Sequence, residues 1–273
     1  MEQRVVKLAV LDLYDNTPNQ GMRAIRQIIE SFGATLDYQV FDVRAKGELP
    51  GLDFDLYISS GGPGSPLDGD GVWDKAYFEL IDSIFAWNQE REDKKFLFLI
   101  CHSFQMVCHH WQLGSITERK SMSFGTFKVH QTPEGRRDII FKDLPDPFFV
   151  ADFRHWQFIQ PREDRFAELG ARILALEKIR PHIDLERAVM AIRFSPEIFG
   201  TQFHPEADRD GMLLHFLKEE NKTKVIETHG HDKYNKMIRD LNNPKKIKLT
   251  NETVLPTFIS QAIEATVRAV VNV

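Results

Sequence analysis

The sequence predicts an α/β fold, in which an open, mostly parallel sheet has helices on both faces and an antiparallel β excursion. Three observations support this class. The first half of the 273 residues alternates strand-like and helix-like segments, as parallel sheets covered by helices do. The middle holds short strand-like runs between turns, and about 55 residues at the end are charged and helix-like. The length suits one large domain with an addition.

The elements of the first half follow from its hydrophobic pattern. Apolar, β-branched runs predict strands, and apolar residues at helical spacing predict helices. In chain order we expect a strand at Val5–Leu13, a helix at Gly21–Phe32, strands at Tyr38–Val43 and Leu56–Ser59, a helix at Trp73–Trp87, a strand at Phe96–Ile100 and a helix at Ser103–Leu113.

From about residue 124 the pattern indicates antiparallel β structure and then helices. Short strands are expected at Phe127–His130, Asp138–Phe141, Phe148–Phe153, Ile173–Glu177, Val189–Arg193 and Phe199–Phe203, with a helix at Asp208–Leu217. These elements complete a domain at residues 1–218. Residues 219–273 form a charged, helical C-terminal extension, in which Thr257–Val271 is amphipathic. Its apolar content is too small for a separate core, so we expect it to pack on the domain.

Composition and charge argue against several classes of protein. The net charge of −5 and the sequence pI near 6.1 give no reason to expect nucleic acid as a partner. The longest apolar runs are far shorter than the roughly 20 residues that a bilayer requires, so no membrane partner is expected. Cys101 and Cys108 are the two cysteines, and they lie too far apart along one helix to pair. A reduced, cytoplasmic location fits this cysteine content best.

Two candidate site segments follow predicted strands, at the edge where open parallel sheets place their active sites. Gly61-Gly62-Pro63 is a glycine-rich turn that lets backbone N–H groups approach a ligand, although strand-to-helix turns favour glycine anyway. Cys101 stands directly between an apolar strand and a helix. The positive end of that helix favours a thiolate, and the N–H of His102 is placed to bind an oxyanion. A buried structural cysteine is the alternative.

The third segment is Phe203-His204-Pro205-Glu206, which follows the last predicted strand. A catalytic histidine needs a carboxylate on its second ring nitrogen to orient it, and Glu206 is close enough along the chain to supply one. A lone His-x-Glu is common by chance. The three segments together are more specific than any one of them.

The order and residues of these segments closely resemble the class I glutamine amidotransferase family, whose members are Cys-His-Glu glutaminases, over roughly residues 5–217. The resemblance rests on Gly61-Gly62-Pro63, on Cys101 with Gln105 four residues later, and on Phe203-His204-Pro205-Glu206. Ser123–Phe127 is also similar to a Phe-Gly segment of the family. The glutaminase domain of GMP synthase is, loosely, the nearest relative. The resemblance implies a flavodoxin-like fold and a reaction that needs no cofactor and no metal.

The resemblance also implies catalytic roles. Cys101 is expected to attack the side-chain amide of glutamine, with assistance from His204, which Glu206 orients. The N–H groups of Gly62 and His102 are expected to hold the oxyanion of the tetrahedral intermediate. His204 would then protonate the departing ammonia, and water would hydrolyse the γ-glutamyl thioester to glutamate.

Substrate contacts are expected from four further residues. Gln105 matches the glutamine of the family's elbow, and Gly61 belongs to the glycine-rich turn. Arg154 and His155 lie where the family carries a segment near its substrate, and either could contact the substrate carboxylate. A packing role at the end of a strand is an equal alternative for this pair.

Two residues depart from the family's elbow pattern. Leu99 and Ser103 stand where the family has glycines that let the helix and the strand approach closely. Serine is small, so the change at Ser103 is mild. Leu99 is larger and could shift the elbow, narrow the glutamine pocket, or be accommodated by its neighbours.

The sequence leaves the partner and the exact reaction open. No acceptor domain fits in 273 residues, so ammonia would go to a separate synthetase subunit or be released. Alternatives are a γ-glutamyl amide hydrolase, an acyltransferase of the homoserine O-succinyltransferase type, and a catalytically silent regulatory or binding protein. The extension is expected either to cover the active site or to form a homodimer contact.

Overall fold

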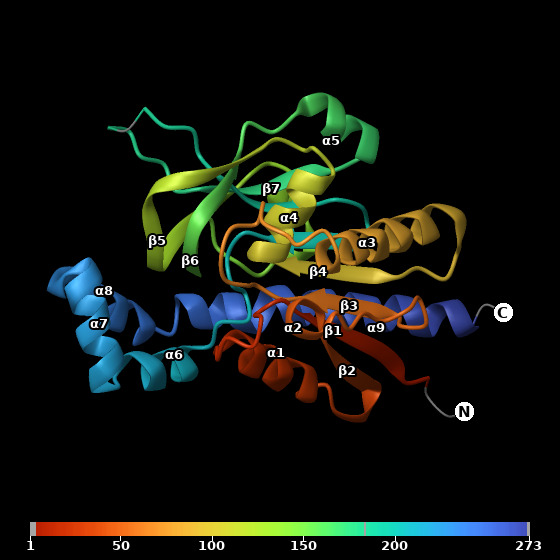
Figure 1. The fold of residues 1–273 in the computed structure, drawn as a ribbon, viewed down its shortest axis with the longest axis horizontal. Helices are drawn as coiled ribbons and strands as arrows, with labels where there is room; N and C mark the ends of the chain where they lie inside the picture. The colour runs from red at the N-terminus through yellow and green to blue at the C-terminus, as the bar shows by residue number, and fades with distance from the viewer. Residues whose placement is uncertain (1–3, 183, 272–273) are drawn as a thin grey trace.

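A nine-stranded sheet forms the centre of the computed structural model, which describes residues 4–182 and 184–271 (Figure 1). The strand order is β2-β1-β3-β4-β9-β8-β7-β5-β6. The first five strands in this order run parallel and the remaining pairs are antiparallel. The sheet is therefore mixed and open, and its parallel half confirms the α/β class.

The parallel half brings three loops to one edge of the sheet. Its strands are β1 (Val6–Asp12), β2 (Leu36–Asp42), β3 (Leu56–Ser59), β4 (Phe96–Ile100) and β9 (Ile198–Thr201). The strands β3, β4 and β9 are adjacent, and all of their residues are buried. Because parallel strands end at the same edge, the segments that follow these three strands meet there.

Helices cover both faces of the parallel strands. The helices α1 (Gly21–Glu30) and α9 (Ile247–Val271) bury apolar residues on one face, and α2 (Val43–Lys46), α3 (Trp73–Glu90) and α4 (His102–His110) bury theirs on the other. The helix α9 extends along the whole parallel half (Figure 1). Its Phe258 is 1% exposed, and its ring lies against those of Phe96, Phe98 and Phe199. The C-terminal extension thus supplies one layer of the main core.

The antiparallel half is built from longer strands than the sequence indicates. Its strands are β5 (Ser115–Gln131), β6 (Phe148–Ile159), β7 (Arg172–Glu177) and β8 (Val189–Arg193). The strands β5 and β6 form a long hairpin, whose register shifts between Glu118 and Ser123. Polar and charged residues in these strands hide the pattern, which explains why only fragments of β5 and β6 are recognisable in the sequence.

One expected strand is wrong. Asp138–Phe141 leads into a 3-10 helix at Ile139–Phe141, after another at Gly135–Arg137. The carboxylate of Asp138 accepts from the N–H of Ile140 at 3.1 Å and from the guanidinium of Arg193 at 2.6 and 2.7 Å. A helix cap held by a buried ion pair therefore overrides the apolar run.

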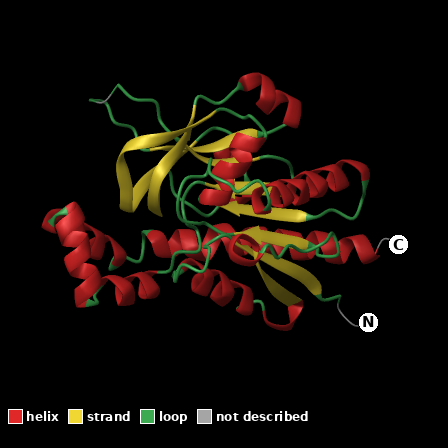
Figure 2. Cartoon of the chain, viewed as in Figure 1, coloured by secondary structure: helices red, strands yellow, loops and turns green. Residues whose placement is uncertain are grey.

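The remaining helices lie beside the β5–β6 hairpin (Figure 2). They are α6 (Arg209–Phe216), α7 (Glu219–His229) and α8 (His231–Leu241), and they share a third hydrophobic cluster with Phe124 and Phe153 of the hairpin. The short α5 (Glu163–Leu169) and a 3-10 helix at Gly33–Thr35 complete the structure. None of the helices in the described residues is long and apolar enough to cross a lipid bilayer.

Candidate active site

Cys101 occupies a sharp elbow between β4 and α4. Its backbone angles are φ 50° and ψ −94°, a conformation that residues with a side chain rarely adopt. The Cys101 N–H donates to the carbonyl of Thr201 at 2.7 Å, and the Ser103 hydroxyl donates to the carbonyl of Ser59 at 2.9 Å. These bonds fasten the elbow to β9 and β3. The thiol consequently stands at the N-terminus of α4, with the free N–H groups of the first helical turn beside it.

The glycine-rich turn after β3 lies against the elbow. A Cβ on Gly61 would come within 2.9 Å of Cε1 of His204, and one on Gly62 within 2.6 Å of the carbonyl oxygen of Leu13. Both positions therefore require glycine. Arg44 donates to the carbonyl of Pro63 at 2.8 Å and so holds the far side of the turn. This packing places the backbone of Gly61 and Gly62 close to Cys101.

His204 and Glu206 form a buried pair at the end of β9. The Nδ1 of His204 and the Oε1 of Glu206 are 2.7 Å apart, and the Glu206 side chain is 1% exposed. Burial alone would lower the pKa of His204, but the carboxylate of Glu206 and the neighbouring Cys101 together raise this pKa well above its usual value. The imidazole is thus held in the state in which it can pair with a thiolate.

The loop that carries this pair is fixed from two sides. The N–H of His204 donates to the carbonyl of Ala151 in β6 at 3.0 Å. The side chain of Asn251, in α9, donates to the backbone carbonyl of Glu206 at 2.9 Å. The C-terminal helix therefore contributes directly to the position of the pair, which the sequence did not indicate.

A cavity of about 350 Å³ opens over these residues. Besides Gly62, Cys101, His204 and Glu206, its lining includes Tyr14, Arg23, Phe153, Asp208 and Phe216. The segment from Tyr14 to Ala24, after β1, and the helix α6 supply most of the walls. The sequence could have indicated Tyr14 as a lining residue, because Tyr14 follows the first strand and the carboxyl end of that strand lies at the same edge of the sheet. Nothing in the sequence pointed to the residues of α6.

An ion pair stands at the rim of this cavity. The guanidinium of Arg23 contacts the carboxylate of Asp208, which also caps α6 by accepting from the N–H of Gly211 at 2.6 Å. Burial raises the pKa of Tyr14 well above its usual value, and the nearby Glu206 adds to this effect. The cavity thus offers a cation, an anion and a neutral hydroxyl to a small polar ligand.

Gln105 lies behind the nucleophile and does not line the cavity. Its side chain is buried and donates to the side-chain oxygen of Gln202 at 3.0 Å, and the amide nitrogen of Gln202 lies 3.9 Å from the sulfur of Cys101. Gln105 is therefore placed to support the elbow through Gln202.

The expected oxyanion residue His102 has a buried ring. Burial, with a smaller contribution from Arg44, lowers the pKa of His102 to about 3, so the ring is neutral at physiological pH. The ring of His102 packs beside Gly62. The backbone N–H groups of His102 and Gly62 therefore belong to neighbouring segments, as the expected oxyanion site requires.

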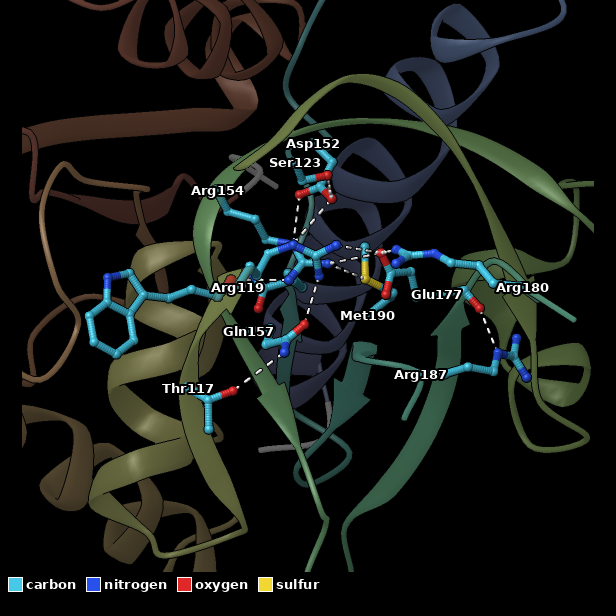
Figure 3. A network of polar contacts seen from close by, with 12 residues as sticks. Thr117, Arg119, Ser123, Asp152, Arg154, Gln157, Glu177, Arg180, Arg187 and Met190 are labelled. Carbon is cyan, nitrogen blue, oxygen red and sulfur yellow. Dashed lines mark hydrogen bonds and ion pairs between the residues drawn. The ribbon is translucent and has the colours of Figure 1, made fainter. Parts of the chain in front are cut away.

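Arg154 belongs to an internal network and not to the cavity lining (Figure 3). Its guanidinium pairs with Asp152 at 2.9 Å and lies 3.8 Å from the carboxylate of Glu177. His155, the neighbouring residue, is exposed and also lies outside the lining. These positions favour the packing alternative for the Arg154–His155 segment.

Leu99 is accommodated by its neighbours. It is fully buried in the hydrophobic cluster that α3 and α4 share, whereas Cys101 faces the cluster on the other side of the sheet. On the adjacent strand it pairs with Gly200, where an added Cβ would lie 3.2 Å from the Cβ of Leu99. The leucine therefore fills space over a glycine and does not narrow the cavity.

A cysteine at a strained elbow and a buried histidine–carboxylate pair thus share one cavity at the end of the parallel strands of a mixed α/β sheet. The sequence model described as "Glutamine amidotransferase class-I" matches residues 10–223. The chain belongs to this family, whose members hydrolyse the side-chain amide of glutamine.

Solved structures share the fold. A glutamine amidotransferase from Thermotoga maritima has 18% identity and a TM-score of 0.70, with 96% of this chain and 99% of that one covered. A glutamine amido transferase from Methylobacillus flagellatus has 13% identity and a TM-score of 0.60, with 98% and 95% covered. A protein from Thermoplasma acidophilum, described as a GMP synthase subunit, has 18% identity and a TM-score of 0.51, with 84% and 100% covered. No curated protein matches the sequence with significant similarity.

Proposed function

We propose that the chain hydrolyses the side-chain amide of L-glutamine, or of a related γ-glutamyl compound, through a thioester on Cys101. One observation carries the proposal: Cys101, His204 and Glu206 all line one cavity. Within it, Nδ1 of His204 and Oε1 of Glu206 are 2.7 Å apart. The cavity volume of about 350 Å³ suits a ligand of amino-acid size.

The reaction follows from these positions. The thiolate of Cys101 attacks the amide carbon, and the N–H groups of Gly62 and His102 stabilise the oxyanion. The carbon–nitrogen bond then breaks as His204 gives its proton to the leaving ammonia. A water molecule, deprotonated by His204, attacks the thioester carbon; the carbon–sulfur bond breaks, glutamate leaves, and the thiolate is restored.

The ammonia is proposed to pass to a separate synthetase subunit. The described residues form one glutaminase-type fold with its C-terminal helices, and the T. maritima relative has nearly the same extent. The T. acidophilum relative, whose description names it as part of a synthase, supports a search for such a partner. Co-purification of the chain with a synthetase, with glutamine-dependent product formation only in the mixture, would test this step.

The nucleophile is tested by labelling with a diazo-ketone analogue of glutamine, followed by intact-mass measurement. We expect one adduct on the wild type, blocked by excess glutamine and absent from Cys101→Ala. Cys108→Ala is the matched control, because Cys108 is fully buried and burial raises the pKa of its thiol well above the usual value. This control should label like the wild type.

Two results would contradict the proposal. An adduct that persists in Cys101→Ala would place the nucleophile elsewhere. The absence of any adduct, while iodoacetamide still modifies Cys101, would show a reactive cysteine with a different substrate, such as the acyl donor of an acyltransferase.

A further inference from the structure

A second cavity lies between the β5–β6 hairpin, the end of β7 and α8, and shares no lining residue with the active-site cavity. Its volume is about 320 Å³. Three phenylalanines and four lysines dominate its walls: Phe124, Phe127, Phe149, Lys128, Lys178, Lys233 and Lys236. We call it the lysine cavity. It contains no acidic lining residue, although the chain as a whole has a net charge of −5.

Aromatic rings hold the ammonium groups in place. The Nζ atoms of Lys233 and Lys178 lie 4.8 and 5.3 Å from the centroid of Phe127. Those of Lys128 and Lys246 lie 5.8 and 4.4 Å from the centroid of Phe149. These are distances of cation–π contact, so the lysines are positioned by the walls without being neutralised.

The carboxylates near the cavity are already bound to other cations. Glu177, which precedes Lys178, is contacted by Arg119 at 3.0 Å, by Arg154 at 3.8 Å and by Arg180 (Figure 3). This single carboxylate therefore has three guanidinium groups around it, and its attraction for Lys178 is outweighed by burial and by Arg180.

Two further carboxylates are committed in the same way. Asp152 pairs with Arg154 and accepts from Ser123, and Asp240 pairs with both Lys236 and Lys246. Of the four lysines that line the cavity, only Lys236 forms an ion pair in the described part of the chain, whereas Lys128, Lys178 and Lys233 form none. Lys128 is exposed, so Lys178 and Lys233 are the two half-buried ammonium groups that face the lysine cavity without an ion-pair partner.

Burial lowers the pKa of both Lys178 and Lys233. Neighbouring cations lower it further, Arg180 and Lys236 for Lys178, and Lys178 and Lys236 for Lys233, against smaller opposing effects of Glu177 on Lys178 and of Asp152 on Lys233. Gly125 lies in the wall of the cavity with φ 115°, a conformation that a side chain would strain.

We propose that the lysine cavity is a binding site for a small molecule that carries phosphate groups. Phosphate can supply two or more negative charges in a small volume, and lysine binds it as a point charge. Apolar walls strengthen this attraction, because they keep water away from the charges. The proposal does not rest on the glutaminase reaction, because the two cavities share no lining residue.

The test measures pyrophosphate binding to the full chain at low ionic strength by calorimetry and by thermal unfolding. We expect saturable binding and a rise in Tm for the wild type. The variant Lys178→Met/Lys233→Met replaces the two half-buried lysines and keeps their apolar stems. It should weaken binding at least about tenfold, because charge-assisted bonds are lost. Lys178→Arg/Lys233→Arg retains the charges and should restore most of the affinity.

Matched controls separate the site from general effects. Lys75→Met removes an exposed lysine on α3 and should bind pyrophosphate like the wild type. Labelling of Cys101 by the glutamine analogue should be unchanged in every lysine variant, which shows that they are folded and separates this test from that of the proposed function.

Each further outcome is decisive. Tighter binding of ADP than of pyrophosphate would identify a nucleotide as the phosphate source, and equal binding would identify a free diphosphate; both support the site. Absence of saturable pyrophosphate binding, or equal binding by the wild type and the Met double variant, would overturn it. Equal binding of citrate would overturn the assignment to phosphate.

Discussion

Glu206→Gln isolates the charge of the carboxylate that orients His204. The substitution keeps the size of the side chain in a site where Glu206 is 1% exposed, and the amide oxygen can still accept from Nδ1 of His204 at the present separation of 2.7 Å. What it removes is the negative charge that opposes the effect of burial on the pKa of His204.

The size of the effect follows from the hydrogen bond. A bond to a charged group contributes about 1.5–3 kcal/mol and a neutral one about 0.5–1.5 kcal/mol, so the substitution costs roughly 1–2 kcal/mol. That corresponds to a fall in kcat/KM of about 5- to 30-fold. The sign of the pH effect also follows. The folded-state pKa of His204 is raised well above its usual value in the wild type, so removal of the charge makes the imidazolium lose its proton at lower pH.

The assay is glutamate release from glutamine, measured as kcat/KM over a range of pH. We expect the part of the pH profile that depends on protonated His204 to move to lower pH in the variant, because the imidazolium loses the carboxylate charge that favours it. Glu220→Gln, which replaces an exposed glutamate of α7, is the control and should match the wild type in both kcat/KM and pH profile. A kcat/KM within about twofold of the wild type, with an unmoved pH profile, would refute the reasoning.

Three further predictions concern packing. Leu99→Gly should lower the free energy of unfolding by about 3–5 kcal/mol, because it leaves a cavity in the core and places a glycine within a strand. The KM for glutamine should stay unchanged, because Leu99 faces away from the active-site cavity, and a changed KM at normal stability would contradict this. Gly61→Ala should lower kcat more than stability, because its Cβ would press on His204, and steady-state kinetics with denaturant unfolding separate the two. Phe258→Ala should cost about 3–5 kcal/mol in denaturant unfolding, and a cost as small as that of a surface substitution would show that α9 is not part of the core.

The sequence indicated where the candidate site residues lie because their signal is local. Cys101, Gly62 and His204 each follow an apolar strand, and the edge at which parallel strands end is common to all three. The strand bounds for Leu56–Ser59 and Phe96–Ile100 are confirmed to the residue, since both strands are buried on both faces and are made almost entirely of apolar residues.

The walls of the cavity could not be predicted in this way. Phe153 and Phe216 come from a β-hairpin and a helix that are far apart in sequence, and they meet only because a separate hydrophobic cluster forms around Phe124. Asn251 likewise reaches Glu206 from α9, at a separation of 45 residues. Such contacts depend on tertiary packing, which hydrophobic periodicity does not encode.

The helix α9 and the loop that carries His204 and Glu206 are parts of one structural unit. The sequence predicts residues 219–273 to be a charged, helical extension packed on the domain, with an amphipathic segment at Thr257–Val271. The exposed faces of α7 and α8 are polar. In α9 the apolar residues Phe258 and Ile259 complete the core beneath β4 and β9, and Asn251 holds the loop of Glu206. Since one helix stabilises both the sheet and the loop, removal of the extension would disturb the orientation of His204 through the fold itself. A lid or dimer role for the extension therefore needs point substitutions on α7 and α8, not truncation, as its test.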